Sequence, residues 1–442
     1  MKYIYKLLKL TLSVCMLLLT VTACTDNDVE PLFDQSINER IDEVKTEYTD
    51  ILTSSEYGWV GYYSPNKDFG AFTMLMDFDD SGYVSIASDY LKGAEDNTIT
   101  YRIAKTLKLE LVLETHAVFH AIYEINDNNN DGEYVFNILS VTEDEVVLES
   151  KTDYGDDITI FTLRKATQAD LDLQPTFDSV DNLTGDGSES VFRNILLNDQ
   201  AIASFEFDAS SRVATITYIQ NGQEITTTKP VVITAEGFYF IEPVEINGTI
   251  LTSFTYDATN NEYVNTEDGL RIIYDQLPLY IGNDVQYLVQ TGNPVFLYRP
   301  SLGSFPLTSP AHDTMYEAMN AQLNAAGFTL FEYSLTLDFN SDATCANQIR
   351  VVVQRNSDGA NFFAFYCFDK PVVQDGRLYL DYVGTYGDGE ALIYVLAPIV
   401  NMFNSAEGLL FTHEGNFGSY SNTAGTFTSL DNPALRVYGV FL

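Results

Sequence analysis

Short apolar runs separated by turn residues constrain the fold of this chain more than any other feature. Residues 72–78 form such a run, Asp79-Asp80-Ser81-Gly82 supplies a turn, and residues 83–86 resume the apolar pattern. This arrangement is typical of a β-hairpin. Comparable runs recur at residues 98–103, 107–113, 133–139, 145–150, 157–164, 202–207, 213–219, 224–228, 231–234, 237–241, 250–256 and 270–274. The sequence therefore predicts an α+β fold that is predominantly antiparallel β, with β-rich domains and a few packed helices.

Three segments carry the apolar spacing of helices instead. Ser36-Ile37-Asn38-Glu39 has the form of a capping box, which predicts a helix that begins at residue 37. Ser309-Pro310 pairs an N-cap residue with proline at the first helical position, so we expect a second helix near residues 310–326. A third is expected near residues 390–405, where Pro398 should kink or split it.

The N-terminus has the pattern of an export signal. Three lysines precede an uncharged apolar run at residues 10–21, which is too short for a stable membrane span. The run ends in Val21-Thr22-Ala23-Cys24, which resembles the bacterial lipobox, and the resemblance implies lipidation of Cys24. The acidic residues 25–30 resemble the surface-export signal of Bacteroidetes-type lipoproteins. We therefore expect an outer-membrane lipoprotein that faces the cell exterior and contacts the membrane through its lipid anchor.

A polar segment divides the rest of the chain. Residues 166–190 are rich in turn residues, and strand patterns lie on both sides of them. We expect a signal peptide at 1–23, a lipidated acidic tether at 24–32, an N-terminal helix plus antiparallel β-domain at 33–165, a linker at 166–190 and a C-terminal β-rich domain at 191–442.

The charge of the chain restricts its partners. It has 23 basic and 63 acidic residues, a formal net charge of −40. Such a field repels phosphate backbones, so we expect no nucleic-acid partner. Neutral glycans, cations and basic partners are compatible with this negative charge.

Two short segments resemble metal sites in part. His116 and His120 have the spacing of zinc ligands on a helix, but Ala117 stands where a metallopeptidase needs glutamate. Asp127, Asn129 and Asp131 match the first half of a calcium-binding loop, which lacks the glutamate that should close it. The sequence favours ordinary histidines and a plain loop tip, so we expect no zinc or calcium cofactor.

Cys345 and Cys367 are the two cysteines that follow Cys24. In an oxidising envelope they can form a disulfide, and two partly buried thiols are an equal alternative. No nucleophile elbow, Cys-x-x-Cys, phosphate loop or dinucleotide fingerprint occurs in the sequence. We therefore assign no catalytic residue and favour a protein that is not an enzyme.

Three features together resemble one family. These are the lipobox, the start Phe33-x-x-Ser36-x-x-Glu39-Arg40, and Gly58-Trp59 followed by a Phe-rich hairpin. They are similar to uncharacterised Bacteroidetes-type surface lipoproteins with a domain of unknown function, and the resemblance is clearest over residues 24–165. It implies a locus beside TonB-dependent transporters and starch-utilisation-type proteins.

The leading hypothesis is a non-catalytic accessory protein in nutrient capture, which binds a glycan or peptide and works beside a TonB-dependent transporter complex. An unrecognised, metal-dependent hydrolase and a structural component of a surface assembly are the alternatives. The sequence leaves the ligand and the oligomeric state open.

Overall fold

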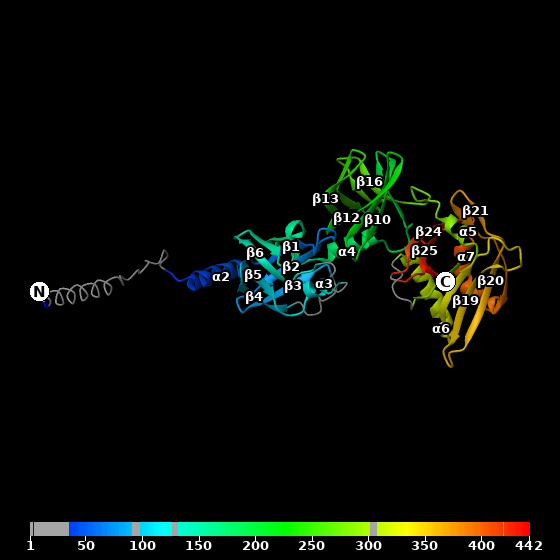
Figure 1. Ribbon diagram of the computed structural model, residues 1–442, viewed down its shortest axis with the longest axis horizontal. Coiled ribbons are helices and arrows are strands. Elements are labelled where there is room, and N and C mark those ends of the chain that lie inside the picture. The colour runs from blue at the N-terminus through cyan, green and yellow to red at the C-terminus, as the bar shows by residue number, and fades with distance from the viewer. Residues whose placement is uncertain (1–2, 4–34, 91–97, 126–130, 301–306, 419) are drawn as a thin grey trace.

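Three β-units follow one another along the long axis of the molecule (Figure 1). The computed structural model describes residue 3 and residues 35–90, 98–125, 131–300, 307–418 and 420–442. The units are two closed eight-stranded barrels, here barrel 1 and barrel 2, and a ten-stranded C-terminal sheet. Strand pairs in all three are antiparallel, which confirms the predicted β-rich fold with a few helices. Within the described ranges, no helix has the length and apolar character needed to cross a membrane.

Barrel 1 is a meander in which each strand pairs with the next. Pairing of Trp59 in the first strand with Lys165 in the last closes it. Alternate residues of its strands face inward, as Val84 and Ile86 do in the third strand, and build an aromatic-rich core. Its strands are β1 (Trp59–Tyr63), β2 (Phe72–Phe78), β3 (Tyr83–Ser88), β4 (Thr98–Lys105), β5 (Leu109–Leu113), β6 (Val135–Val141), β7 (Glu145–Ser150) and β8 (Ile160–Lys165).

Helix α2 (Ile37–Thr53) packs against barrel 1 and starts where the sequence predicted. Ser36 accepts from the Glu39 backbone N–H and the Glu39 side chain accepts from the Ser36 N–H, which completes the capping box. At the other end, Trp59 is fully buried and its indole N–H donates to the Leu52 carbonyl over 2.8 Å. This bond ties the helix to the first strand. Helix α3 (Val118–Tyr123) and the 3₁₀ turn η2 (Gly155–Asp157) complete the unit.

Barrel 2 is a second closed meander, in which the last strand pairs with the first. Its core includes Phe205, Phe238 and Phe254. The strands are β9 (Phe192–Leu197), β10 (Gln200–Asp208), β11 (Val213–Gln220), β12 (Gln223–Thr234), β13 (Gly237–Ile246), β14 (Thr249–Asp257), β15 (Glu262–Asn265) and β16 (Leu270–Asp275).

The segment expected to be a linker, residues 166–190, is largely ordered into helix. It holds the 3₁₀ turn η3 (Gln168–Leu171) and helix α4 (Gln174–Thr184), which contacts barrel 2. Leu183 of α4 is fully buried in the core of that barrel. Apolar burial therefore holds the polar-looking segment in place, and residues 191–442 comprise two sheets where we expected one domain.

The C-terminal sheet has the strand order β21-β22-β24-β25-β26-β17-β18-β19-β20-β23. Its strands are β17 (Val295–Tyr298), β18 (Phe328–Thr336), β19 (Asn347–Arg355), β20 (Asn361–Phe368), β21 (Val372–Gln374), β22 (Arg377–Tyr379), β23 (Tyr382–Gly387), β24 (Leu409–Asn416), β25 (Thr423–Ser429) and β26 (Arg436–Phe441). Its helices are α5 (Val285–Thr291), α6 (Pro310–Ala325) and α7 (Gly389–Phe403).

The two predicted C-terminal helices are confirmed. Ser309 caps α6 by accepting from the His312 N–H over 3.3 Å. Helix α7 continues through Pro398 rather than splitting, because its apolar face, including Val395, Leu396 and Phe403, is buried in the core. That burial offsets the hydrogen bond that proline cannot donate.

Candidate functional site

A cleft separates barrel 2 from the C-terminal sheet, and we name it the interdomain cleft. Its cavity has a volume of about 330 Å³ and is lined by β9 and β10 on one side and by β24 and β26 on the other. A main-chain bond from the Val191 N–H to the Pro433 carbonyl, 3.0 Å, joins the two walls at one end. Ligand sites occur preferentially in clefts between domains, so this cavity is the candidate site.

Carboxylates from both walls gather in the interdomain cleft. Glu206 lies on β10, Glu414 lies on β24, and Asp284 directly precedes α5. The Asp284 carboxylate accepts from the His413 N–H over 2.9 Å, and that of Glu414 accepts from the Thr426 hydroxyl over 2.8 Å. Burial raises the pKa of Glu414, the Thr426 hydroxyl and Arg436 lower it, and the charges of Glu206 and Asp284 raise it again. Acids of both domains thus line one cavity.

Asn194 is among the residues that line the same cavity. Its side-chain N–H donates to the Asp275 carboxylate over 2.9 Å, which fixes the orientation of the amide. The residue is 2% exposed, and its Oδ1 has no hydrogen-bond partner among the described residues. A buried carbonyl oxygen without a donor costs about 1–3 kcal/mol.

Arg193 forms part of the cleft wall and is held on three sides. Its Nη1 donates to the Leu183 carbonyl over 2.6 Å. Its guanidinium carbon lies 5.3 Å from the ring centre of Phe205 and 5.4 Å from that of Tyr274. Burial lowers the pKa of Arg193, and the nearby tyrosines and glutamates oppose that shift. The side chain is therefore a fixed cation between two aromatic rings.

A smaller cavity of about 170 Å³ adjoins the cleft and shares Val191, Arg193 and Arg436 with it. In this cavity, Tyr274 OH and Glu189 Oε2 are buried without a hydrogen-bond partner in the described part of the chain. Both atoms point toward Gly185, where a methyl group would lie 2.9 Å from the Tyr274 oxygen and 3.3 Å from Glu189 Oε2. Arg436 Nε is likewise unpartnered within the described ranges. Three residues that line this cavity thus each have a buried polar atom without a partner in the described part of the chain.

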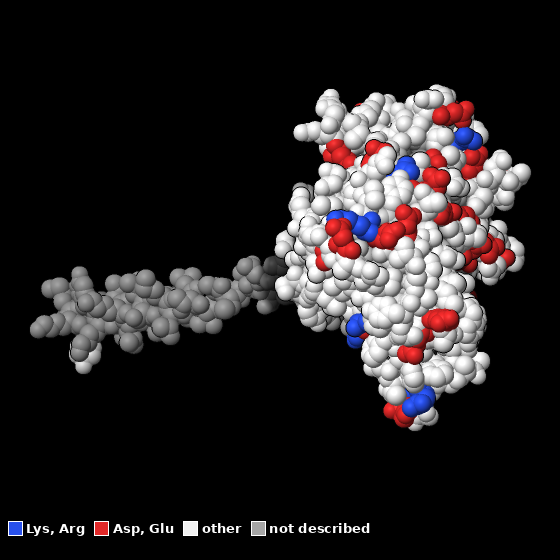
Figure 2. Space-filling view, turned by 90° about the vertical axis from the view of Figure 1, so that its right-hand side faces the viewer, with Lys and Arg blue, Asp and Glu red and all other residues white. Residues whose placement is uncertain are grey.

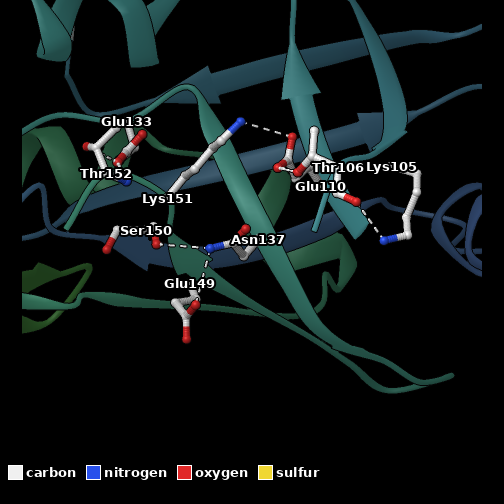
Figure 3. Close-up of polar contacts among 9 residues, drawn as sticks. All are labelled: Lys105, Thr106, Glu110, Glu133, Asn137, Glu149, Ser150, Lys151 and Thr152. Atoms are coloured by element: carbon white, nitrogen blue, oxygen red, sulfur yellow. Dashed lines mark hydrogen bonds and ion pairs between the residues drawn. The ribbon is translucent and has the colours of Figure 1, made fainter. Parts of the chain in front are cut away.

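Barrel 1 carries a different kind of polar cluster (Figure 3). Glu110, Asn137 and Lys151 come from neighbouring parts of the β5–β6–β7 surface. Lys151 Nζ lies 3.0 Å from Glu110 Oε2, and Asn137 donates to Glu149 over 3.2 Å. Buried Glu133 accepts from the Thr152 backbone N–H over 2.6 Å. These groups satisfy one another, so the cluster stabilises the barrel and offers little to a ligand.

The two histidines lie side by side on barrel 1. His116 precedes α3 and His120 lies within it, with ring centres 5.7 Å apart. His120 stacks on Tyr134 at 4.4 Å, and its Nδ1 accepts from the Ala117 N–H. Burial lowers its pKa, and His116 lowers it further. Across the described residues, no group of three His, Cys, Asp or Glu side chains is placed to hold a metal ion. A zinc site at His116 and His120 stays an untested hypothesis.

The remaining predicted sites are the calcium loop, the lipidated cysteine and the two later cysteines. The calcium-loop residues Asp127 and Asn129, and the lipidation residue Cys24, lie outside the described residues, whereas Asp131 is described and exposed. Cys345, just before β19, and Cys367, in β20, form a disulfide with Cα atoms 4.8 Å apart. The structure therefore has the disulfide, one of the two alternatives left open by the sequence.

Sequence reasoning missed the interdomain cleft. Its polar residues are far apart in the chain and stand singly in ordinary strand patterns. One signal was present: Arg193 and Asn194 interrupt the apolar strand Phe192–Leu197, and both are buried. Adjacent polar residues inside a buried strand indicate a special environment.

A family model described as a domain of unknown function (DUF4302) matches residues 29–258. The chain belongs to this family. The DUF4302 match includes α2, barrel 1 and barrel 2 through β14, so barrel 2's wall of the cleft lies within it. No curated protein matches the chain.

Among solved structures, a double mutant of the vaccine antigen transferrin binding protein B (TbpB) from Haemophilus parasuis Hp5 aligns at 11% identity with a TM-score of 0.12. The alignment covers 84% of this chain and 65% of that protein, less than two thirds of its length. At this TM-score the likeness carries no argument about fold or function.

Proposed function

We propose that this DUF4302 protein is a lipid-anchored protein of the outer cell surface that captures a nutrient solute without transforming it. The observation that carries the proposal is the interdomain cleft itself, a cavity of about 330 Å³ between two domains. Its lining combines apolar side chains, such as Leu410, with polar and charged ones, such as Thr412 and Glu414. Solute sites usually lie in clefts between domains and have this mixture of apolar surface and a few polar groups.

The proposed lipid anchor and the proposed location on the outer cell surface are inferred from the sequence. Acyl chains on Cys24 would hold the protein at the membrane, and the acidic residues after it support export to the outer face. Figure 2 shows acidic side chains spread over one face of the molecule, with few and scattered basic ones. Such a surface disfavours polyanions and is compatible with a glycan or peptide ligand passed to a TonB-dependent transporter.

The proposal is tested with the purified full-length protein in detergent, screened by thermal shift against peptides and neutral oligosaccharides. A ligand that binds the native state stabilises it by about 2.7 kcal/mol at a hundredfold excess over Kd. We expect at least one class to raise the melting temperature without being consumed. Turnover of the ligand, or no shift with either class, would overturn the proposal.

A further inference from the structure

The outer face of the C-terminal sheet has a pair of stacked aromatic rings at one edge. Phe365 of β20 and Tyr386 of β23 are directly opposite one another in the strand register. Their ring centres lie 4.3 Å apart, with an angle of 3° between the ring planes. Ala364 and Tyr366, the neighbours of Phe365 in β20, are buried in the core together with residues of helix α7. Because side chains alternate along a strand, the stacked rings lie on the face away from this helix.

Tyr386 is held in one position and is half exposed. Its hydroxyl donates to the Gln348 side-chain oxygen over 2.8 Å, and one ring face rests on Phe365. Within the described part of the chain β23 is the last strand at this edge, so no strand covers the other ring face. Tyr386 is 47% exposed, and Phe363, on the same face of β20 as Phe365, is 40% exposed. A side chain that is already fixed loses little conformational entropy when a ligand packs on it.

We name Phe363, Phe365 and Tyr386 the aromatic platform, and its area is small. A whole aromatic side chain buries about 150–250 Å², so at their exposures Phe363 and Tyr386 together offer roughly 200 Å². A stable protein interface takes about 800 Å² from each partner. The platform by itself is therefore too small for a second copy of the chain, and its size suits a small ligand.

The free edge of β23 is poorly suited to strand addition. A β-bulge interrupts its pairing with β20 between Cys367 and Phe368. The Tyr382 N–H already donates to the Asn404 side chain over 2.7 Å. Bulges and occupied backbone groups keep an edge strand from pairing with another chain. An extended peptide is therefore a poor occupant of this edge.

The polar groups beside the platform suit a neutral ligand with hydroxyl groups. Gln354 and Asn361 are opposite one another on the same face, one row beyond Phe363, and their side chains are joined by a hydrogen bond of 3.3 Å. Amides both donate and accept, as hydroxyl groups do. Arg350, also on this face, donates to the Glu332 carboxylate over 3.2 Å, so its charge is balanced. The net charge of −40 repels anionic ligands in addition.

We propose that the aromatic platform binds a neutral oligosaccharide, whose sugar rings pack on Tyr386 and Phe363 while their hydroxyl groups bond to the neighbouring amides. The C–H groups on the apolar face of a sugar ring carry a slight positive charge, which the negative face of an aromatic ring attracts. Strands β17, β18 and β19 separate the platform from the strands that line the interdomain cleft. This site is therefore additional to the cleft and does not depend on capture there.

Fluorine NMR of the full-length protein labelled with 3-fluorotyrosine reports on the platform directly. The protein is titrated in detergent with maltohexaose, cellohexaose and xylohexaose. Tyr386→Phe and Tyr394→Phe assign the signals of two exposed tyrosines, the second of which lies on α7 outside the platform. We expect at least one hexasaccharide to shift the Tyr386 signal and to leave the Tyr394 signal in place.

Phe363→Ala tests the platform by mutation. It should raise the hexasaccharide concentration that gives half of the Tyr386 shift at least fivefold, whereas Tyr394→Ala should leave that concentration unchanged. Phe363 is exposed, so the substitution spares the core.

Two results would overturn the sugar site. In the first, none of the three sugars moves the Tyr386 signal, or each moves the Tyr386 and Tyr394 signals alike. In the second, the Tyr386 signal moves with protein concentration alone, which would assign the platform to a second copy of the chain. Neither result bears on capture in the interdomain cleft, because the Tyr386 signal reports on a different part of the sheet.

Discussion

Asp89 of barrel 1 and Arg212 of barrel 2 form a buried ion pair across the junction of the two barrels. Arg212 Nη2 lies 3.4 Å from Asp89 Oδ2, and the two side chains are 4% and 1% exposed. Asp89 also accepts from the Thr73 N–H over 2.7 Å, and the Arg212 guanidinium lies over the Phe72 ring. Removing either partner would leave the other charge buried, so the pair fixes how the barrels meet.

The pair makes stability depend on pH. Burial, the largest influence, raises the pKa of Asp89 to about 6, against the lowering effects of Arg212 and the Thr73 N–H. The folded state therefore holds the proton more tightly than the unfolded chain, whose aspartate pKa is about 3.9. The stabilising contribution is full below that value and is lost as the pH rises through about 6.

Asp89→Asn removes this titration. Between pH 4 and pH 7, the free energy of unfolding of the wild type should fall relative to the variant by about 2 kcal/mol. Urea denaturation of both proteins at pH 4, 5, 6 and 7 measures the difference. A difference that stays constant over this range would contradict the assignment.

Gly70 is required by the close approach of the barrels. Its N–H donates to the Ser211 carbonyl over 2.8 Å, and an added methyl group would lie 2.1 Å from the Arg212 carbonyl oxygen. Gly70→Ala should therefore lower the free energy of unfolding by about 1–3 kcal/mol through overpacking. Small-angle scattering should also show a changed angle between the barrels.

Gly282→Ala is the matched control for Gly70. The nearest atom to its added methyl group would be Asp284 Oδ1 at 3.8 Å, an ordinary contact. If Gly70→Ala retained both the stability and the scattering profile of the control, the junction would not depend on this close approach.

The disulfide should stabilise the C-terminal sheet. Cys345 and Cys367 are 22 residues apart. A disulfide that closes a loop of this length lowers the entropy of the unfolded chain and thereby stabilises the folded protein by about 3 kcal/mol. A Cys345→Ala/Cys367→Ala double variant should lose that amount in guanidinium denaturation. Dithiothreitol should destabilise the wild type but not the variant, and an unchanged wild type would argue against the bond.

The elements predicted correctly are those with local signals. The capping box of Ser36 and Glu39 and the Ser309-Pro310 start each specify a helix through contacts within one turn. Helix α4 was not predicted because it is stabilised by burial of Leu183 in barrel 2, whose strands follow the helix in the sequence. Local patterns do not record such tertiary contacts.

Barrel closure and the candidate site depend on pairings between distant segments. Trp59 meets Lys165 to close barrel 1, and nothing near either residue marks that register. Asn194 and Glu414 each look like an ordinary strand residue, and only the packing of barrel 2 against the C-terminal sheet brings them to one cavity. The antiparallel β class was therefore predictable, whereas the site was not.

Blocking the interdomain cleft tests the central claim most directly. Thr412 is exposed on β24 and lines the cavity, so Thr412→Trp should fill it while sparing the core. Thr228→Trp, on an exposed part of β12 outside the cavity, is the control. Calorimetry uses the peptide or oligosaccharide that stabilises the wild type most. We predict that Thr412→Trp loses at least tenfold in affinity while Thr228→Trp binds normally; wild-type affinity in Thr412→Trp would contradict capture in this cleft.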